Sequence, residues 1–167
     1  MMDKKTETLK KRLQGDAACT WAIAGVIILK GFIKIFTAIS GFMNGGTMKG
    51  SYDESPAILL GDGIREILIA IAVALLAMVL TEIMKTGRPF TKSTVKKFRI
   101  MASVIICCAV VKMLVSCVAG FFDPQATFQL SIELLDLWYG VVGTMIGIIS
   151  EIFHYGYELQ EDMDAIA

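Results

Sequence analysis

Four long apolar segments restrict the fold of this chain more than any other feature of its sequence. They cover about residues 17–42, 57–84, 100–122 and 128–153. Each reaches the roughly 20 residues with which an α-helix crosses about 30 Å of hydrocarbon. The second contains a run from Ile67 to Leu80 without a polar side chain, so it lacks the polar face of a helix in a soluble bundle. We therefore predict an all-α, polytopic membrane protein with a bundle of four transmembrane helices.

The composition leaves little room for a further domain. Hydrophobic residues make up 55% of the 167 residues and charged residues 19%. Four spans take up roughly 80 to 90 residues, and the gaps between them are short and rich in glycine and proline. The first segment is longer than the roughly 7 to 15 apolar residues of a secretory signal. We predict a single transmembrane domain over residues 1–167, in which the first segment is retained.

Lysine and arginine are distributed unevenly between the gaps, and this predicts the orientation in the membrane. Five precede the first segment and six lie between the second and the third, whereas the other two gaps hold Lys49 alone. Cytoplasmic loops are enriched in these residues, so we expect the amino terminus and a basic loop at residues 85–99 to be cytoplasmic. Four spans then return the chain to the cytoplasm, where an acidic tail at residues 155–167 shares a compartment with the basic loop.

Charged residues inside the apolar segments form the first candidate site. A charge at the centre of a membrane helix costs about 2.5 to 3.5 kcal/mol on the insertion scale, so it usually meets a counter-charge, water or the protein interior. By the predicted orientation nearly all of these residues lie in the outer half of the membrane. We expect a ligand-binding or ion-pair cluster, and the alternative is that the residues only fix helix register or snorkel. The cluster comprises Lys30, Lys34, Asp62, Arg65, Glu66, Lys112, Glu133 and Asp136.

The cytoplasmic face holds the second candidate site. We expect Gly87 and Pro89 to end the second helix, and Thr91 or Ser93 to cap the third. The basic loop would bind anionic headgroups at about 1 kcal/mol per basic residue. The tail is expected to extend the fourth helix and either to fold against the loop or to offer an acidic surface to another protein. The predicted partner-binding residues are Arg88, Lys92, Lys96, Arg99, Glu158, Glu161 and Asp162.

Small residues at four-residue spacing predict close helix packing. Gly143 and Gly147 form such a pair in the fourth segment, and Ala70 and Ala74 form one in the second. In lipid, helices associate through backbone contact at small residues. The pattern leaves open whether these surfaces pack within one chain or between the copies of a homo-oligomer.

Residue patterns typical of active sites are absent from the sequence. The four cysteines lie within the apolar segments without metal-ligand spacing, and His154 is the only histidine. We find no nucleophile with a base and no glycine-rich phosphate loop. The 16 basic residues balance the 16 acidic ones, so no overall field attracts nucleic acid. We expect a protein that is not an enzyme, has no cofactor and no metal site, and does not contact nucleic acid directly.

Two short motifs resemble a known family. The segment Gly87-Arg88-Pro89-Phe90-Thr91 precedes the third apolar segment, and the run Tyr155-Gly156-Tyr157-Glu158-Leu159-Gln160-Glu161 lies in the acidic tail with Asp162 and Asp164. With the four-segment layout, they resemble the bacterial domain-of-unknown-function 2975 family. Its members are four-span membrane proteins of undefined biochemistry, often encoded beside small Cro/CI-type helix-turn-helix regulators. The resemblance implies a place in the bacterial cytoplasmic membrane and a DNA-binding regulator as cytoplasmic partner.

These observations favour a non-enzymatic integral membrane regulator or sensor that controls a cytoplasmic helix-turn-helix transcription regulator. The alternative is a small transporter or channel subunit that uses the charges of the outer half. A conducting path needs polar residues at all depths, and the inner halves of the segments are almost free of them. The second alternative is a structural membrane scaffold, which the same features also permit.

Overall fold

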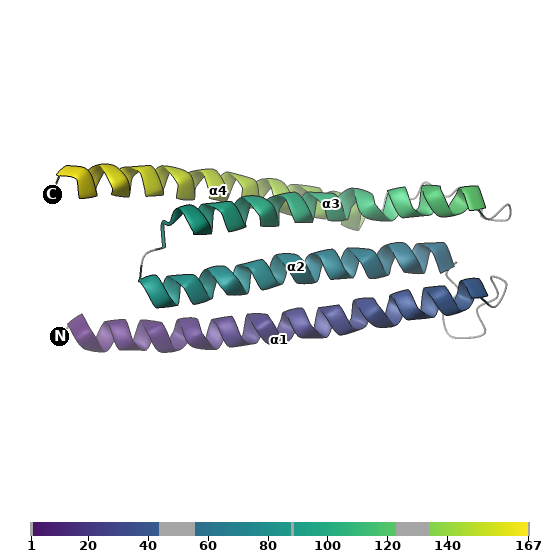
Figure 1. The fold of residues 1–167 in the computed structure, drawn as a ribbon, viewed down its shortest axis with the longest axis horizontal. Coiled ribbons are helices and arrows are strands. Elements are labelled where there is room, and N and C mark those ends of the chain that lie inside the picture. The colour runs from purple at the N-terminus through teal and green to yellow at the C-terminus, as the bar shows by residue number, and fades with distance from the viewer. Residues whose placement is uncertain (1, 44–55, 88, 123–133, 167) are drawn as a thin grey trace.

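Four long helices make up the structure, which is a computed structural model (Figure 1). It describes residues 2–43, 56–87, 89–122 and 134–166, and within these ranges the side chains of residues 2–7, 9, 10, 112, 113, 116, 117, 119–122 and 134–136 are left aside. The all-α prediction is confirmed for this part of the chain. The helices are α1 (Met2–Met43), α2 (Pro56–Thr86), α3 (Lys92–Phe122) and α4 (Leu134–Ile166).

Three predicted apolar segments and the described part of the fourth each fall within one helix, and two of the helices run well beyond their segments. Segments 17–42, 57–84 and 100–122 lie inside α1, α2 and α3. The fourth segment lies inside α4 from residue 134 onward, while its residues 128–133 are outside the described ranges. Helix α1 includes the basic leader, and α4 includes the acidic tail almost to its end. The prediction that the tail extends the fourth helix is confirmed.

The turn between α2 and α3 forms as its residues predict. Gly87 has a positive φ of 66° and its N–H donates to the carbonyl oxygen of Ile83 at 2.8 Å, so it closes the last turn of α2. Thr91 caps α3, because its Oγ1 accepts a hydrogen bond from the N–H of Thr94 at 3.1 Å. The cap therefore uses Thr91 and not Ser93, whose hydroxyl points to α2.

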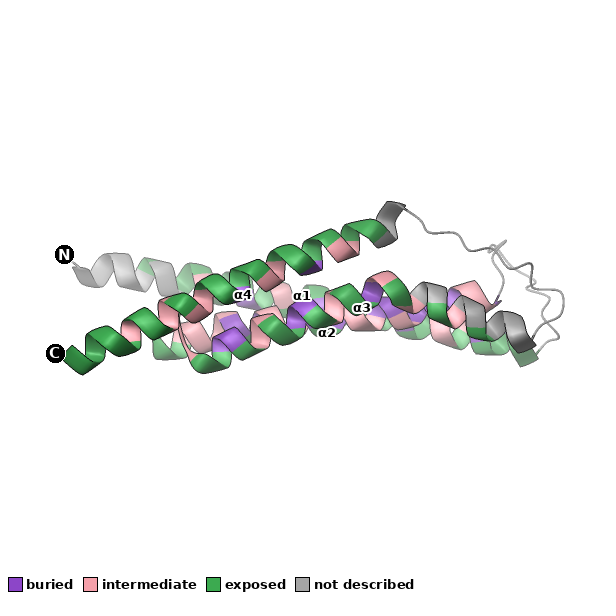
Figure 2. Ribbon diagram, turned by 90° about the horizontal axis from the view of Figure 1, so that it is seen from above, coloured by how far each residue is buried: buried purple, intermediate pink, exposed green. Residues whose placement is uncertain are grey.

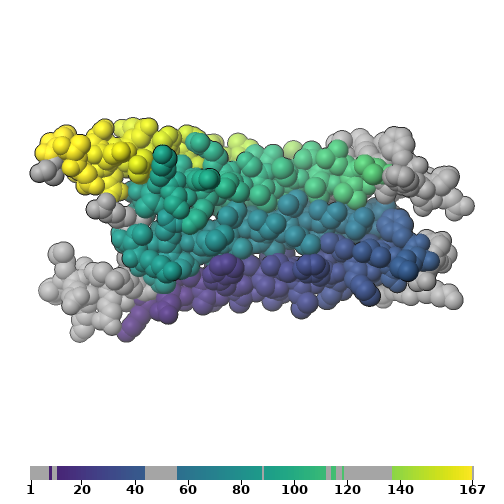
Figure 3. Space-filling view, in the orientation of Figure 1, coloured from purple at the N-terminus to yellow at the C-terminus, as the bar shows by residue number. Residues whose placement is uncertain are grey.

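The helices lie side by side in one open row in chain order. Among the described residues, α1 packs on α2, α2 on α3, and α3 on α4, while the backbones of α1 and α4 do not approach each other. Figure 3 shows the row as bands of colour that follow the sequence. The predicted bundle is thus an open layer within one chain. Helix α2 has a neighbour on both sides, and α1 and α4 form the two edges.

The burial pattern agrees with a membrane location. The most buried apolar side chains are small and lie at the helix contacts, such as Ala24, Ala38, Ala70 and Ala77, whereas large apolar side chains cover the outward faces. Figure 2 shows α4 exposed along most of its length. Three helices are long and apolar enough to cross a membrane, with the ranges Lys11–Met43, Pro56–Thr86 and Leu137–Ile166. Helix α3 is not among these three, judged on its described residues.

Both ends of the chain lie at the same end of the molecule. In Figure 1 the start of α1 and the end of α4 are found beside the turn that joins α2 to α3. The end of α1 and the start of α2 lie at the opposite end. The four helices therefore run along the length of the molecule in alternate directions.

Candidate functional site: two ionic networks joined by α2

A close crossing of α1 and α2 places the first ionic network. Gly31 and Gly63 face each other there, and a Cβ added to either glycine would lie 3.1 Å from the other's carbonyl oxygen. The absence of side chains at these two positions lets the backbones approach, as glycine pairs do in membrane helices. The crossing brings Lys30 and Lys34, which flank Gly31, to the level of Asp62 and Glu66, which flank Gly63.

Glu66 is the centre of this first network. Its Oε1 lies 2.8 Å from Nζ of Lys34 and 3.1 Å from Nζ of Lys30. Nζ of Lys34 also approaches Oδ2 of Asp62 at 4.0 Å. The side chain of Glu66 is only 11% exposed, whereas that of Lys30 is 66% exposed at the edge of the row. The expected pairing of α1 lysines with α2 acids is therefore present.

Arg65 connects the network to the other two helices. Its Nη2 lies 2.8 Å from Oδ1 of Asp62, one helical turn earlier. Its guanidinium carbon lies 5.8 Å from the ring centroid of Tyr139 on α4, within the range of a cation–π contact. Its carbonyl oxygen accepts a weak hydrogen bond from the thiol of Cys108 on α3, with an Sγ–O distance of 4.0 Å. The charged residues of α2 therefore touch all three other helices.

The described part of this network carries an excess of positive charge. Three bases, Lys30, Lys34 and Arg65, face two acids, Asp62 and Glu66. The second carboxylate oxygen of Glu66, Oε2, is buried and accepts no hydrogen bond from the described residues. Buried polar atoms nearly always have a partner, so this oxygen is a place for a further donor. The described charges of this network therefore do not balance.

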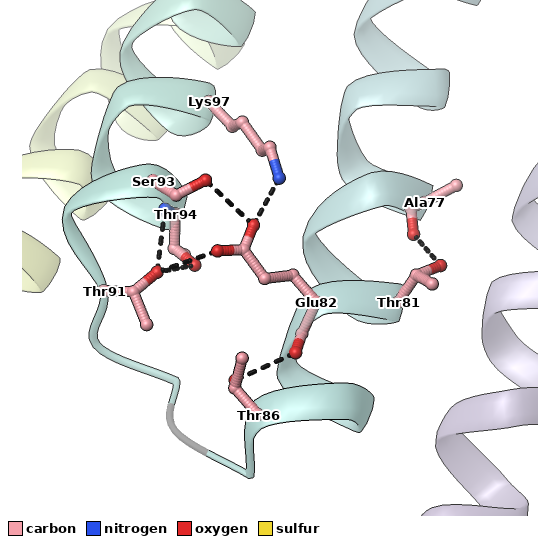
Figure 4. A network of polar contacts seen from close by, with 8 residues as sticks. All are labelled: Ala77, Thr81, Glu82, Thr86, Thr91, Ser93, Thr94 and Lys97. Atoms are coloured by element: carbon pink, nitrogen blue, oxygen red, sulfur yellow. Dashed lines mark hydrogen bonds and ion pairs between the residues drawn. The ribbon is translucent and has the colours of Figure 1, made fainter.

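A second ionic network surrounds Glu82, near the turn between α2 and α3. Figure 4 shows its carboxylate between the side chains of Thr91, Ser93 and Lys97. The hydroxyl of Thr91 donates to Oε1 at 3.2 Å, and that of Ser93 donates to Oε2 at 3.0 Å. Lys97 forms an ion pair with the same Oε2. One carboxylate thus holds the end of α2 to the first two turns of α3.

Three aromatic rings pack where α4 passes this turn. The rings of Phe90 and Phe98 each lie against Phe153, with centroid distances of 5.1 and 4.9 Å. A Cβ added to Gly156 would lie 2.8 Å from Cδ1 of Phe90, so this glycine makes space for the ring. Beside them Nη2 of Arg99 lies 2.9 Å from Oε1 of Glu151, on a more exposed surface. The contact between the turn and α4 is therefore largely aromatic.

The acids of the tail remain on the surface of α4. Glu158, Glu161 and Asp162 are all exposed. Oε1 of Glu158 lies 3.7 Å from Nε2 of His154 on the same helix, and Glu161 hydrogen-bonds Tyr157 one turn away. Lys92 and Lys96 on α3 are exposed as well. Of the two expected arrangements, the acidic surface open to another protein fits these positions better than a tail folded on the basic loop.

The structure does not describe the side chains of several predicted site residues. Glu133 and Arg88 lie outside the described residues, and Lys112 and Asp136 lie on α3 and α4 with side chains that are not described. The other residues of the first predicted cluster come together as predicted. Sequence reasoning missed the roles of Glu82, Lys97 and Glu151, because nothing in the sequence near each of them points to its partner on another helix. It also missed Gly31 and Gly63, which lie on different helices.

The packing glycines of α4 have clear roles. A Cβ added to Gly143 would lie 3.1 Å from the backbone nitrogen of Ile106 and 3.2 Å from the carbonyl oxygen of Ala102, so this position holds α4 against α3. At Gly147 the nearest atom is the Cβ of Ala102 at 3.9 Å. The predicted small-residue pair therefore packs within one chain.

Comparison with known proteins adds no relative to this description. No family model matches the chain, and no curated protein or solved structure matches it.

Proposed function

We propose that this chain is a non-enzymatic regulator or sensor that spans a bacterial cytoplasmic membrane four times, with both termini in the cytoplasm. The observation that carries the proposal is the position of the two ionic networks on one helix. Asp62 and Glu66 pair α2 with the lysines of α1, and Glu82 pairs α2 with α3. Glu66 and Glu82 are about 24 Å apart along α2 at 1.5 Å per residue. A shift of α2 relative to α1 therefore also moves the turn between α2 and α3, which we place on the cytoplasmic side.

The signal acts on the first network, in the outer half of the membrane. The carboxylate of Glu66 attracts two lysines of α1, so loss of its charge leaves Asp62 as the one acid that faces the three cations within the described part of the cluster. An anion that binds the lysines weakens the same contact by competition. In either case α1 and α2 lose part of their attraction, and α2 is free to take another position.

A protein partner at the cytoplasmic end responds to the new position of α2. The exposed acids of α4 and the exposed lysines of α3 form a surface of mixed charge beside the turn. The proposed partner is a small helix-turn-helix DNA-binding protein, which the membrane protein holds or releases. This choice rests on the resemblance of the two short motifs, and the exposed position of the tail supports it.

A transport function is the weaker candidate. Between Glu66 and Glu82, the buried residues of α2 are Ala70, Ala72, Ala77 and Val79. The hydroxyl of Thr81 donates to the carbonyl oxygen of Ala77 on its own helix, at 2.7 Å. The described interior therefore offers no chain of polar groups from one network to the other, which a conducting path through one chain requires.

The sensing step is tested by hydrogen exchange in lipid nanodiscs. We expect the amide exchange of residues 89–95 to change with external pH or added anion in the wild type. Glu66→Gln and Lys34→Met should both abolish the change, whereas Thr37→Val, which alters only a hydrogen bond within α1, should keep it. A wild-type response in both Glu66→Gln and Lys34→Met would contradict the proposal.

The partner is tested by affinity capture from native membranes. We expect a small DNA-binding protein to co-purify with the wild type and to be lost when Glu158, Glu161 and Asp162 are replaced by their amides. The control is Glu151→Gln, because this acid is already engaged by Arg99. Capture of no such protein, together with ion flux in proteoliposomes, would favour the transporter instead.

A further inference from the structure

The outer sides of α1 and α4 expose side chains that need a partner other than lipid. The side chain of Lys30 is 66% exposed at membrane depth, although Glu66 binds it from one side. An exposed ammonium group inside the bilayer is unfavourable unless a polar or charged partner covers it. Edge helix α1 therefore needs a neighbour on the side that faces away from α2.

The opposite edge has an apolar stripe that continues beyond the membrane. Tyr155, Leu159, Met163 and Ile166 recur at helical spacing on the tail and are 51 to 87% exposed. These residues follow the predicted fourth span, and in Figure 2 the tail extends past the turn between α2 and α3. On a helical wheel the stripe lies opposite the face that packs on α3 at Gly143 and Ser150. An apolar face of this kind outside the bilayer is typical of a protein contact.

The charges beside the two edges are complementary. Glu158 and Asp162 lie next to the stripe on the helical wheel, and the tail from residue 155 onward has no basic residue. Helix α1 begins with the basic leader, in which Lys11 and Arg12 are exposed and are preceded by Lys4, Lys5 and Lys10. Two acidic tails would repel each other, so a contact between α4 and α4 is disfavoured, whereas one between α4 and α1 is attractive.

The heights of the charges also match. The contacts of Gly31 with Gly63, of Cys108 with Arg65 and of Gly143 with Ile106 define the register across the row. By this register Lys10 is level with Glu158, and Lys4 with Asp164, to within about one helical turn. By the same register Trp138 of α4, 58% exposed beside the line of the stripe, is level with Lys30, and an aromatic ring can cover an ammonium group by a cation–π contact. Copies related by an axis along the membrane normal keep these heights, so the match holds between chains.

We propose that copies of this chain assemble laterally, with α4 of one copy against α1 of the next. The exposed stripe and tail acids of one chain then contact the basic leader of its neighbour, and the neighbour's Lys30 is covered. The contact is head-to-tail, so each copy uses both of its edges, and the assembly is a ring around an axis along the membrane normal if the rotation between copies closes and an open row if it does not. This inference stands whether or not a DNA-binding partner exists, and such a partner would compete with the leader for the tail.

The proposal is tested by disulfide cross-linking between copies in native membranes. Cys19 is exposed on α1, and the register places it level with Ile149, next to the exposed Ile148 of the stripe. In a background with serine at the other three cysteines, Ile148→Cys should form a ladder of dimers and larger species under mild oxidation. Within one chain, α2 and α3 separate the two positions, so any bond joins two chains.

Two control variants separate this contact from other pairings. Met78→Cys, an exposed position of α2 at similar depth, should form no ladder with Cys19. Ile148→Cys combined with Cys19→Ser should remain monomeric. Dimers in that variant would reveal contact between two α4 helices and would overturn the proposal, as would a monomer-only result for Ile148→Cys with Cys19 present, or its cross-linking only to a different protein.

Charge exchange tests the polar part of the contact. Lys11→Glu with Arg12→Glu should reduce the ladder several-fold, and adding Glu158→Lys with Asp162→Lys in the same chain should restore it. A ladder that is unchanged by the first pair of substitutions would overturn the assigned complementarity. Similar yields of membrane-inserted protein in all variants show that folding is not the cause of a loss.

Discussion

Gly31 and Gly63 meet backbone to backbone at the point where α1 crosses α2, directly beside the charged residues of both helices. A Cβ on Gly63 would lie 3.1 Å from the carbonyl oxygen of Gly31 and 3.2 Å from the backbone nitrogen of Ile35. Backbone atoms of a helix do not move aside as a flexible side chain does. The separation of α1 and α2, and with it the geometry of the ion pairs, therefore depends on these two glycines.

Gly63→Ala should lower the free energy of unfolding by about 1 to 3 kcal/mol, because the added methyl group forces the helices apart. The measurement is reversible unfolding by sodium dodecyl sulfate in mixed micelles, followed by circular dichroism. Gly25→Ala is the matched control on α1, where an added Cβ meets no atom within 4 Å. Equal stability of the two variants would mean that the crossing is not tight.

Removal of Glu66 should be more harmful than removal of Glu66 together with a lysine. Glu66→Gln leaves the two lysines with Asp62 as the one acid beside them among the described side chains, and breaking a buried pair from one side typically costs about 3 to 5 kcal/mol. The double variant Glu66→Gln with Lys34→Met removes the uncompensated charge and should recover a large part of this loss. Unfolding in mixed micelles measures the coupling, and purely additive effects would show that the two residues do not interact.

Glu82→Gln should loosen the turn between α2 and α3. The carboxylate receives hydrogen bonds from Thr91 and Ser93 and pairs with Lys97, and an amide satisfies these donors less well. We expect a loss of about 1 kcal/mol and faster hydrogen exchange at residues 89–95. Glu151→Gln disrupts a pair whose side chains are 61% and 64% exposed, and should change stability by less than about 1 kcal/mol. The reverse order would indicate that the network around Glu82 is not structural.

Phe153→Ala should release the end of α4 from the turn. The ring of Phe153 packs on both Phe90 and Phe98, and each aromatic pair contributes about 0.5 to 1.5 kcal/mol beyond its buried area. Limited proteolysis with trypsin should then cleave at Lys92 and Lys96 several times faster. Tyr155→Ala serves as control, because its side chain is exposed on the other side of α4. Equal cleavage in the two variants would argue against the aromatic contact.

Reporter fusions should place both termini and the turn on the cytoplasmic side. Alkaline phosphatase fused after Met43 should be active, because the end of α1 lies opposite the turn, and the same enzyme fused after Thr86 should be inactive. Green fluorescent protein fused after Ile166 should fluoresce. The opposite set of activities would show that the basic residues do not decide the orientation.

Much of the local structure follows from nearby residues, and the sequence was informative there. Gly87 and Thr91 act within one helical turn of their own positions, so their roles as terminator and cap were predictable. The pairing of Lys34 with Glu66 was also predictable, because the loop of a hairpin fixes the depth of both helices. Residues at similar distances from that loop therefore lie at similar depth. In contrast, Glu82 and Lys97 pair across the turn, and neither residue has a local pattern that reveals the other.

The arrangement of the helices was the least predictable feature. An apolar helix surface looks the same in sequence whether it faces lipid or another helix, since both environments are apolar. The exposed Val26 and the buried Ala24 of α1 differ in size but not in polarity. The open row therefore becomes visible only in three dimensions, as does the contact between Phe90 and Gly156.

The ion pairs between α1 and α2 have a consequence for membrane insertion during synthesis. Lys30 and Lys34 emerge from the ribosome before Asp62 and Glu66, and each lysine alone is unfavourable in the bilayer. We therefore expect the first helix to enter the lipid together with the second, as a hairpin in which the charges are already paired. A chain that ends after Met43 should then insert less efficiently than one that continues to Thr86, although α1 alone is apolar enough to span a membrane.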